Sequence, residues 1–164
     1  MEIADRVFVG GALANNFFKE NGQDVGNSLV SAENFNLTRF LDNPKLILPI
    51  DTVVKDGAIL DAGEQTLVLL REEAMKAQYI LWNGPLGAYE QGYKQPTIEL
   101  SKIVAEATAN GARTILGGGD TLAAIAELGM FDRYTFVSTA GGAMLDYLAK
   151  GTLPGIEALE KGVK

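Results

Sequence analysis

Four glycine-bearing loops contain the residues of this chain that are best suited to chemistry. Each follows a short apolar run, and they are Gly10-Gly11, Asn83-Gly84-Pro85-Leu86-Gly87, Gly117-Gly118-Gly119-Asp120-Thr121 and Ser138-Thr139-Ala140-Gly141-Gly142. Glycine lets the backbone approach a ligand closely, and the free N–H groups at a helix start attract anions. Several such loops converging on one cleft predict a ligand with a phosphate chain.

The composition excludes several other kinds of chemistry. The 164 residues include no Cys and no His, so disulfides, thiol nucleophiles, Cys/His metal sites and a Ser-His-Asp triad are excluded. Lys and Arg total 14 against 21 Asp and Glu, and this net charge of −7 argues against a basic face for nucleic acid. An acidic chain can still hold phosphates through backbone N–H groups and a divalent cation.

The elements that must position these loops are predicted from apolar runs that alternate with helical patterns. Strands are expected at 6–9, 45–50, 79–82, 114–116 and 135–137, and helices at 12–19, 32–41, 64–76, 96–110, 122–126 and 143–148. Asp56-Gly57 predicts a hairpin turn between two further short strands, 51–54 and 58–60. The clearest helical stripe consists of Leu100, Ile103, Val104 and Ala107.

These patterns predict a fold class. Short strands that are apolar on both faces and alternate with helices are typical of a parallel sheet covered by helices. We therefore expect one α/β domain over residues 1–164, built as a three-layer, doubly wound, Rossmann-like parallel sheet. No apolar run approaches the roughly 20 residues that span a bilayer, and no leader segment is visible. We expect a cytoplasmic protein without a membrane or nucleic-acid partner.

The loop at 117–121 carries the strongest single signal. Its glycines offer N–H groups to phosphate oxygens, Asp120 is a hard oxygen ligand suited to Mg²⁺, and Thr121 adds a hydroxyl. Alternatively, Asp120 or Thr121 caps the helix and the glycines form a tight turn. The chain has neither the G-x-x-x-x-G-K-[ST] pattern nor a G-x-G-x-x-G opening its first helix. A P-loop and a Rossmann dinucleotide site are therefore unsupported.

The other loops allow a binding or a structural interpretation. Ser138 or Thr139 either belongs to a second anion site or caps the following helix. Glu90, shortly after the rigid Asn83-Gly84-Pro85 turn, either accepts hydrogen bonds from ribose hydroxyls or is a solvated charge. The loop at 10–11 either receives a flat base or permits close packing of helix and strand.

Seven segments, in order, closely resemble the C-terminal, nucleotide-binding domain of the phosphoglycerate kinase family. They are VFVGGALANNFF, VGNSLV, LPIDTVV, ILWNGPLGAYE, TILGGGDTLAA, FVSTAGGAMLDYL and LPGIEAL. The resemblance covers essentially the whole chain. It implies a two-domain enzyme that transfers a phosphoryl group between 1,3-bisphosphoglycerate and ADP. One domain of that enzyme binds the glycerate substrate, and the other binds the Mg²⁺ nucleotide.

The resemblance also implies roles for individual residues. Gly118, Gly119, Asp120 and Thr121 are expected to hold the phosphates and Mg²⁺, with Asp120 as the metal ligand. Glu90 is expected at the ribose, Asn83 and Pro85 along the nucleotide cleft, and Gly10, Gly11 and Leu48 beside the adenine, with Val30 as a further candidate. Gly119 and Gly142 are the expected catalytic residues, and Gly142 donates its N–H to the transferring phosphoryl group.

Two departures from the family pattern matter. Ala140 stands where the family usually has the first of three glycines, and this is tolerable only if that residue needs no positive φ. The family's earlier strand with its Gly-Gly-Ala-Lys stretch is missing, as is the glycerate-binding domain. We expect a domain truncated at its N-terminus that binds Mg-ADP or Mg-ATP and is catalytically incomplete alone. The alternative is a non-catalytic fold fragment completed by self-association or a partner chain.

Overall fold

A computed structural model describes residues 3–33 and 35–162. The chain divides into two compact units: Met1–Lys76 with Pro85–Ile103 (unit 1), and Ala77–Gly84 with Val104–Lys164 (unit 2). The chain therefore passes between the units at Lys76–Ala77, within the Trp-Asn-Gly-Pro loop and within α4 (Gln95–Ala109). The expectation of one domain over 1–164 stays a prediction.

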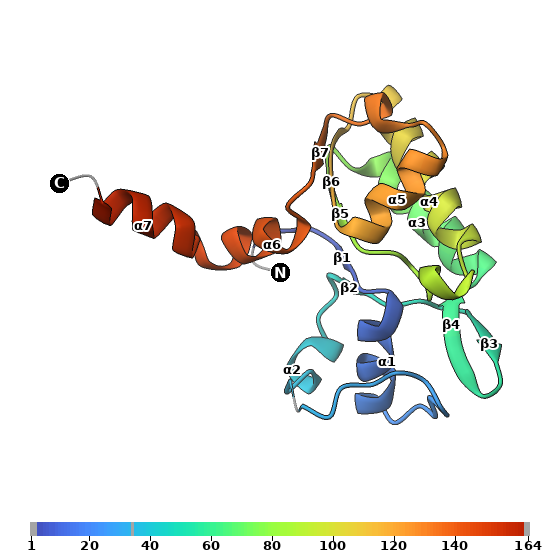
Figure 1. The fold of residues 1–164 in the computed structure, drawn as a ribbon. Helices are drawn as coiled ribbons and strands as arrows, with labels where there is room; N and C mark the ends of the chain where they lie inside the picture. The colour runs from blue at the N-terminus through green and yellow to red at the C-terminus, as the bar shows by residue number, and fades with distance from the viewer. Residues whose placement is uncertain (1–2, 34, 163–164) are drawn as a thin grey trace. The chain divides into compact units, whose positions relative to one another are not determined.

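Unit 1 consists of short strands and helices. Its elements in chain order are β1 (Val7–Phe8), α1 (Gly11–Glu20), α2 (Thr38–Leu41), β2 (Leu46–Ile47), β3 (Thr52–Lys55), β4 (Ala58–Ala62), α3 (Glu64–Lys76), the 3-10 helix η1 (Tyr89–Gln91) and the start of α4. β1 and β2 pair in parallel, whereas β3 and β4 form the antiparallel hairpin visible in Figure 1. Asp56 and Gly57 both have positive φ, +52° and +75°, as the predicted hairpin turn requires.

Helix α3 forms over the predicted residues, Glu64–Lys76, because its N-terminus is well capped. The Asp51 carboxylate accepts hydrogen bonds from the amides of Gln65 and Thr66, at 2.9 and 2.7 Å, and from the Thr66 hydroxyl at 2.7 Å. Burial by itself raises the pKa of Asp51, but the hydrogen bonds outweigh it and leave that pKa below its usual value. Leu70 and Ala74 are buried in the core.

The helix predicted at 32–41 is wrong in its first part. Only Thr38–Leu41 is helical, and residues 32–33 and 35–37 are not. Asn36 has φ +49°, a left-handed conformation that ends any right-handed helix. In addition, Glu33 donates its amide to the Ser31 hydroxyl, a local turn that competes with helix formation.

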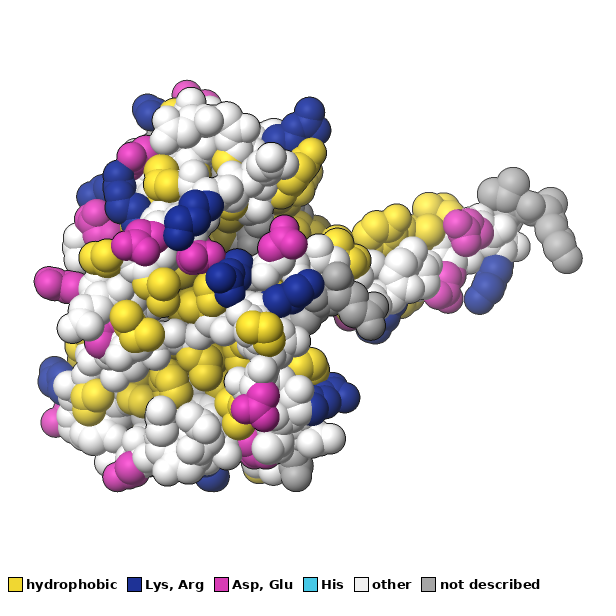
Figure 2. Space-filling model, turned by 180° about the vertical axis from the view of Figure 1, so that it is seen from behind, with side chains coloured by type: hydrophobic (Ala, Val, Ile, Leu, Met, Phe, Trp, Pro, Cys, Tyr) yellow, Lys and Arg dark blue, Asp and Glu magenta, His cyan; other side chains and the backbone are white. Residues whose placement is uncertain are grey.

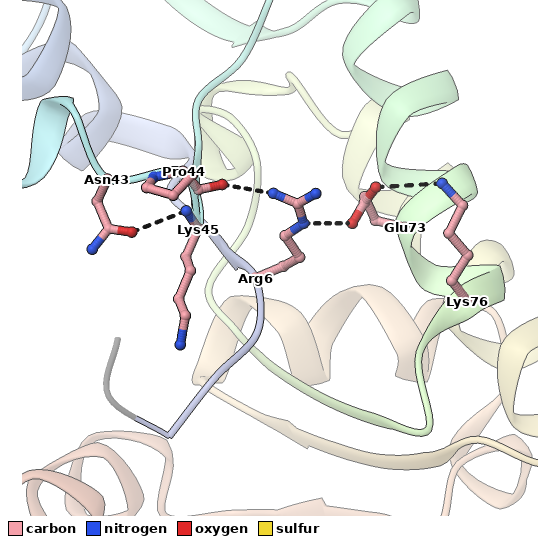
Figure 3. A network of polar contacts seen from close by, with 6 residues as sticks. All are labelled: Arg6, Asn43, Pro44, Lys45, Glu73 and Lys76. Atoms are coloured by element: carbon pink, nitrogen blue, oxygen red, sulfur yellow. Dashed lines mark hydrogen bonds and ion pairs between the residues drawn. The ribbon is translucent and has the colours of Figure 1, made fainter.

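A polar network joins the entry to β1 with the entry to β2 and with α3 (Figure 3). The Arg6 guanidinium donates to the Pro44 carbonyl at 2.6 Å and pairs with Glu73 at 3.3 Å, and Glu73 also pairs with Lys76 at 3.5 Å. The Asn43 side chain accepts the Lys45 amide at 2.9 Å. These contacts hold the β1–β2 pair against the C-terminal part of α3.

Unit 2 is built on a three-stranded parallel sheet in the order β5-β6-β7. Its remaining elements follow in chain order: β5 (Tyr79–Asn83), the end of α4, β6 (Arg113–Gly117), α5 (Gly119–Glu127), the 3-10 helix η2 (Phe131–Arg133), β7 (Phe136–Ser138), α6 (Gly141–Lys150) and α7 (Pro154–Gly162). α5 packs on β6 (Figure 1), and Leu116 of β6 and Ile125 of α5 are both fully buried. The predicted parallel α/β class is confirmed.

The two faces of this sheet differ in exposure. Trp82 and Leu116 are buried, whereas Tyr79, Leu81 and Phe136, which share the opposite face, are 70%, 45% and 59% exposed. α7 also exposes apolar side chains along one side, with charged side chains on the other (Figure 2). Within residues 3–33 and 35–162, no helix has the length and apolar character needed to cross a membrane.

Candidate functional site

The predicted site residues fall into two groups, one in each unit. Unit 1 contains Gly10, Gly11, Leu48, Pro85 and Glu90, together with Val30. Unit 2 contains Asn83, Gly118, Gly119, Asp120, Thr121 and Gly142. The sequence neighbours Asn83 and Pro85 therefore belong to different groups.

The unit 2 group assembles because the three parallel strands end at one level. Asn83 lies opposite Gly117, and Gly117 lies opposite Ser138. The loops that follow β5, β6 and β7 consequently start side by side at the carboxyl edge of the sheet, which is where ligands bind in open α/β sheets.

Side-chain hydrogen bonds tie the end of β5 to the starts of both helices. The Asn83 amide nitrogen Nδ2 donates to the Gly141 carbonyl at 3.1 Å, at the start of α6. The Gly84 N–H donates to the Thr121 hydroxyl at 3.0 Å, in the first turn of α5. Thr121 is fully buried. The structure thus directs both the Asn83 amide and the Thr121 hydroxyl to neighbouring loops.

Glycine is required at two positions of this sheet edge, at Gly141 by close backbone packing and at Gly118 by its positive φ. A Cβ on Gly141 would lie 2.2 Å from the Gly118 nitrogen and 2.6 Å from its Cα. Gly118 has φ +96°. A Cβ on Gly117 would lie 2.7 Å from the methyl carbon at the end of the flexible Met144 side chain, which can move aside. By contrast, a Cβ on Gly119 or Gly142 would meet no atom within 4 Å. The latter two residues therefore border open space at the helix starts.

Neither helix start has a side-chain cap. The residues before α5 and α6, Gly118 and Ala140, make no side-chain capping hydrogen bond. The suggested cap by Asp120 or Thr121 is therefore not formed at this position, and Ser138 accepts the Ala140 amide at 3.2 Å instead of capping the helix proper. Ala140 has φ −114°, so its methyl group is tolerated without strain.

Asp120 is the acidic residue in the first turn of α5, and its side chain is partly accessible. Among the described residues, no cluster of three or more acidic side chains is arranged to hold a metal ion. A cation at Asp120 would therefore need further oxygen ligands from a bound molecule and from water, which is the usual coordination of Mg²⁺ with nucleotides.

In unit 1, Gly10 and Gly11 support close packing of the β1–α1 turn. The Gly11 amide donates to the Leu86 carbonyl at 3.2 Å, and Gly11 has φ +58°. A Cβ on Gly10 would lie 2.7 Å from the Phe8 ring. Leu48 is half-buried after β2, and Glu90 is exposed in η1, so its carboxylate is accessible to a ligand.

Asp61 is a buried acid beside Gly87, in the loop at 85–90. The sequence patterns did not single it out. It is 4% exposed, its Oδ1 accepts the Ala62 amide at 2.9 Å, and its Oδ2 has no hydrogen-bond partner. Burial raises the pKa of Asp61 to about 6, and the Ala62 amide lowers it only in part. A Cβ on Gly87 would lie 2.2 Å from the Asp61 Cγ. The available signal was an Asp in the otherwise apolar run Ala58–Ala62.

Known proteins share the sequence and the fold of this chain. The family model described as "Phosphoglycerate kinase" matches residues 1–151. The chain belongs to the phosphoglycerate kinase family. It is 42% identical to the phosphoglycerate kinase of Chlorobaculum tepidum, in an alignment that covers 96% of this chain. It is 37% identical to the phosphoglycerate kinase of Macrococcus caseolyticus, in an alignment that covers 97% of this chain. Each match covers only 46% of the relative, so the chain spans just under half the length of these phosphoglycerate kinases.

Solved phosphoglycerate kinase structures share the fold. The enzyme from Coxiella burnetii matches with a TM-score of 0.82 and 33% identity, over 99% of this chain and 48% of that one. The enzyme from Pyrococcus horikoshii matches with a TM-score of 0.77 and 30% identity, over 97% and 46%. The predicted Rossmann-like fold of the phosphoglycerate kinase C-terminal domain is thereby confirmed.

Proposed function

We propose that this chain is the Mg-ADP/ATP-binding part of a phosphoglycerate kinase, acting in glycolytic phosphoryl transfer between 1,3-bisphosphoglycerate and ADP. The observation that carries the proposal is the pair of uncapped helix starts at α5 and α6, with open space at Gly119 and Gly142. Unsatisfied N–H groups and helix dipoles at two neighbouring starts favour an anion such as a phosphate chain.

The unit 2 group is assigned to the phosphates. The amides of Gly118, Gly119 and Gly142 donate to phosphate oxygens, and those of Gly119 and Gly142 serve the transferring phosphoryl group. Asp120 holds Mg²⁺, which when bound neutralises charge on the phosphate oxygens. Phosphoryl transfer depends mainly on positioning and charge stabilisation, so residues without a nucleophile or a general base are adequate for this half of the reaction.

The unit 1 group is assigned to the nucleoside. Glu90 is exposed and accepts hydrogen bonds from the ribose hydroxyls, and Pro85 lines the nucleotide cleft. Gly10, Gly11 and Leu48 flank the adenine. The glycerate substrate binds to a separate N-terminal domain of the family enzyme, so the isolated chain is expected to bind nucleotide without turning over.

A second candidate is a fold fragment completed by self-association or by a partner chain. The exposed Tyr79, Leu81 and Phe136 on one sheet face favour it, because parallel sheets are normally covered on both faces. Size-exclusion mass measured at several concentrations separates the two candidates: a monomer at every concentration argues against self-association.

The proposed function is tested by calorimetric titration of the chain with Mg-ADP. Replacing Asp120 by Ala should weaken binding about tenfold or more, because a charged metal ligand is lost. The difference in ADP affinity between wild type and Asp120→Ala should be smaller when EDTA is present in place of Mg²⁺. Asp132→Ala, which removes an exposed acid in η2, is the matched control and should leave the affinity unchanged.

Two results would contradict the proposal. One is the absence of heat from Mg-ADP with a chain that circular dichroism shows to be folded. The other is an equal effect of Asp120→Ala with and without Mg²⁺, which would remove Asp120 from the metal site. Turnover of 1,3-bisphosphoglycerate by the isolated chain would refute catalytic incompleteness while leaving nucleotide binding in place.

A further inference from the structure

We propose that Thr121 and Asn83 act as positioning residues, whose side chains hold the starts of α5 and α6 at a set spacing. The proposal rests on the proposed function, because the spacing matters only if both helix starts bind one phosphate chain. It adds a positioning role to those that the family resemblance implied for these two residues.

The burial of Thr121 is the first argument. Its side chain is fully buried, and its hydroxyl oxygen accepts the Gly84 N–H at 3.0 Å. A ligand could reach this hydroxyl only by displacing protein atoms. Through this bond, the first turn of α5 is held against the residue that follows β5.

Asn83 makes the matching connection to α6. It is the last residue of β5, and its Nδ2 donates to the Gly141 carbonyl at 3.1 Å. Asn83 and Gly84 are joined by one peptide bond, so a short path runs from Thr121 through Gly84 and Asn83 to Gly141. The end of β5 thereby connects the two helix starts directly.

Close backbone contact makes this spacing narrow. The Gly141 Cα faces the Gly118 backbone so closely that a Cβ there would lie 2.2 Å from the Gly118 nitrogen. The Gly118 position also faces the Asn83 side chain, because a Cβ there would lie 3.0 Å from Oδ1. If either hydrogen bond is lost, the helix starts can separate, and their N–H groups then converge less well on one anion.

The consequence is selective for the phosphates. Nucleoside contacts are assigned to unit 1, whereas the α5 and α6 starts belong to unit 2. Loosening the path should therefore weaken ADP binding and leave adenosine binding nearly unchanged. A general loss of folded protein would weaken both ligands together.

The experiment compares Thr121→Val, which keeps the shape and removes the hydroxyl, with Thr121→Ser, which keeps the hydroxyl. Amide hydrogen exchange is measured by NMR on the ligand-free chain, and Mg-ADP and adenosine affinities are measured by calorimetry. Thr121→Val should speed exchange of the Gly84 amide about tenfold or more and lower the ADP-to-adenosine affinity ratio about tenfold. Thr121→Ser should keep the Gly84 exchange rate and the affinity ratio within about twofold of their wild-type values.

Thr114→Val is the matched structural control. Thr114 is also fully buried in unit 2, and its hydroxyl accepts the Thr135 amide at 3.1 Å, but it lies near the amino end of β6. This variant should lose comparable stability in urea while the ADP-to-adenosine ratio and the Gly84 exchange rate stay at their wild-type values.

Asn83→Asp tests the second bond, because a carboxylate cannot donate to the Gly141 carbonyl. It should lower the ADP-to-adenosine ratio, and the double variant with Thr121→Val should lose less than the product of the two single effects. If the effect of the double variant equals the product of the two single effects, the two hydrogen bonds act independently and the shared path is refuted.

The inference is overturned if Thr121→Val leaves Gly84 exchange unchanged without ligand yet weakens ADP, because Thr121 would then contact the nucleotide directly. It is also overturned if the Thr121 and Thr114 variants shift the ratio equally. Failure of the proposed function is a separate result: the wild-type chain would then bind no ADP, whereas the exchange measurement would still report the hydrogen bond.

Discussion

The two groups of predicted site residues are held together by different kinds of contact. In unit 2, the loops after β5, β6 and β7 meet backbone to backbone, with Gly141 against Gly118 and two hydrogen bonds from the end of β5. In unit 1, the loop at 85–90 is held by the Leu86 and Ala88 amides, which donate to Thr97 at 3.0 Å and Leu60 at 2.8 Å. A buried acid, Asp61, lies beside it.

This difference predicts different sensitivities. Backbone contacts between glycines depend on shape and are insensitive to pH and salt, so a single methyl group should disrupt unit 2. Unit 1 depends on ionisable and paired side chains, Asp61, Asp51 and Arg6, so its stability should follow pH and, weakly, salt. The following variants test this contrast in decreasing order of expected effect.

The largest effect is expected from Gly141→Ala. Its Cβ would lie 2.2 Å from the Gly118 nitrogen, a backbone atom that cannot move without shifting α5 or α6. We expect unfolding free energy to fall by about 3 kcal/mol, measured by urea denaturation followed by circular dichroism, together with loss of Mg-ADP binding.

Gly142→Ala is the control for stability, because its Cβ would meet no atom within 4 Å. It should be neutral or stabilise α6 by up to about 1 kcal/mol, since alanine is the better helix former. Equal destabilisation by the two variants would show that helix-start flexibility, rather than glycine-to-glycine contact, sets the stability of unit 2.

An intermediate effect is expected from Asp61→Asn. Because the folded pKa of about 6 lies above the ordinary value of 3.8 for an aspartic acid, folding favours the protonated acid. The contribution of Asp61 to stability is therefore greatest below pH 3.8 and is lost as pH rises through about 6. Relative to wild type, Asp61→Asn should gain on the order of 2 kcal/mol between pH 4 and pH 7.5, as urea denaturation at several pH values would show.

Asp51→Asn should show the opposite sign. Hydrogen bonds hold the pKa of Asp51 below its usual value despite burial, so its stabilisation is present above the unfolded pKa and is lost as pH falls. The Asn variant should be destabilised at pH 7, with a smaller deficit in acid. If both variants responded to pH in the same direction, burial beside Gly87 would not be what distinguishes Asp61.

The smallest effect is expected from Arg6→Met. The Arg6 side chain is 55% exposed, and its pair with Glu73 is accessible to solvent, so its removal should cost at most about 1 kcal/mol. The cost should shrink between about 0.05 M and about 1 M salt. Lys150→Met, which breaks the exposed pair with Asp146 in unit 2, is the control and should change stability by less than about 0.5 kcal/mol.

Local patterns predicted most of the elements because their causes are local. The stripe Leu100, Ile103, Val104 and Ala107 is buried along α4, and the turn at Asp56-Gly57 forms as predicted. The helix at 32–41 was over-predicted because Asn36 adopts a left-handed conformation, which the sequence pattern did not reveal. The roles of Asn83 and Thr121 could not be separated from ligand contact, because their partners, Gly141 and Gly84, lie 58 and 37 residues away.

The sequence by itself determined the family, the parallel α/β class and the loops that border the candidate site, because glycines, apolar periodicity and ordered motifs are readable along the chain. Only the tertiary structure decided which glycines pack against backbone and which border open space, and that Asp61 is buried with an unpartnered oxygen. The physical reason is that burial and close approach depend on residues distant in the chain. Local spacing constrains only the backbone conformation of neighbours.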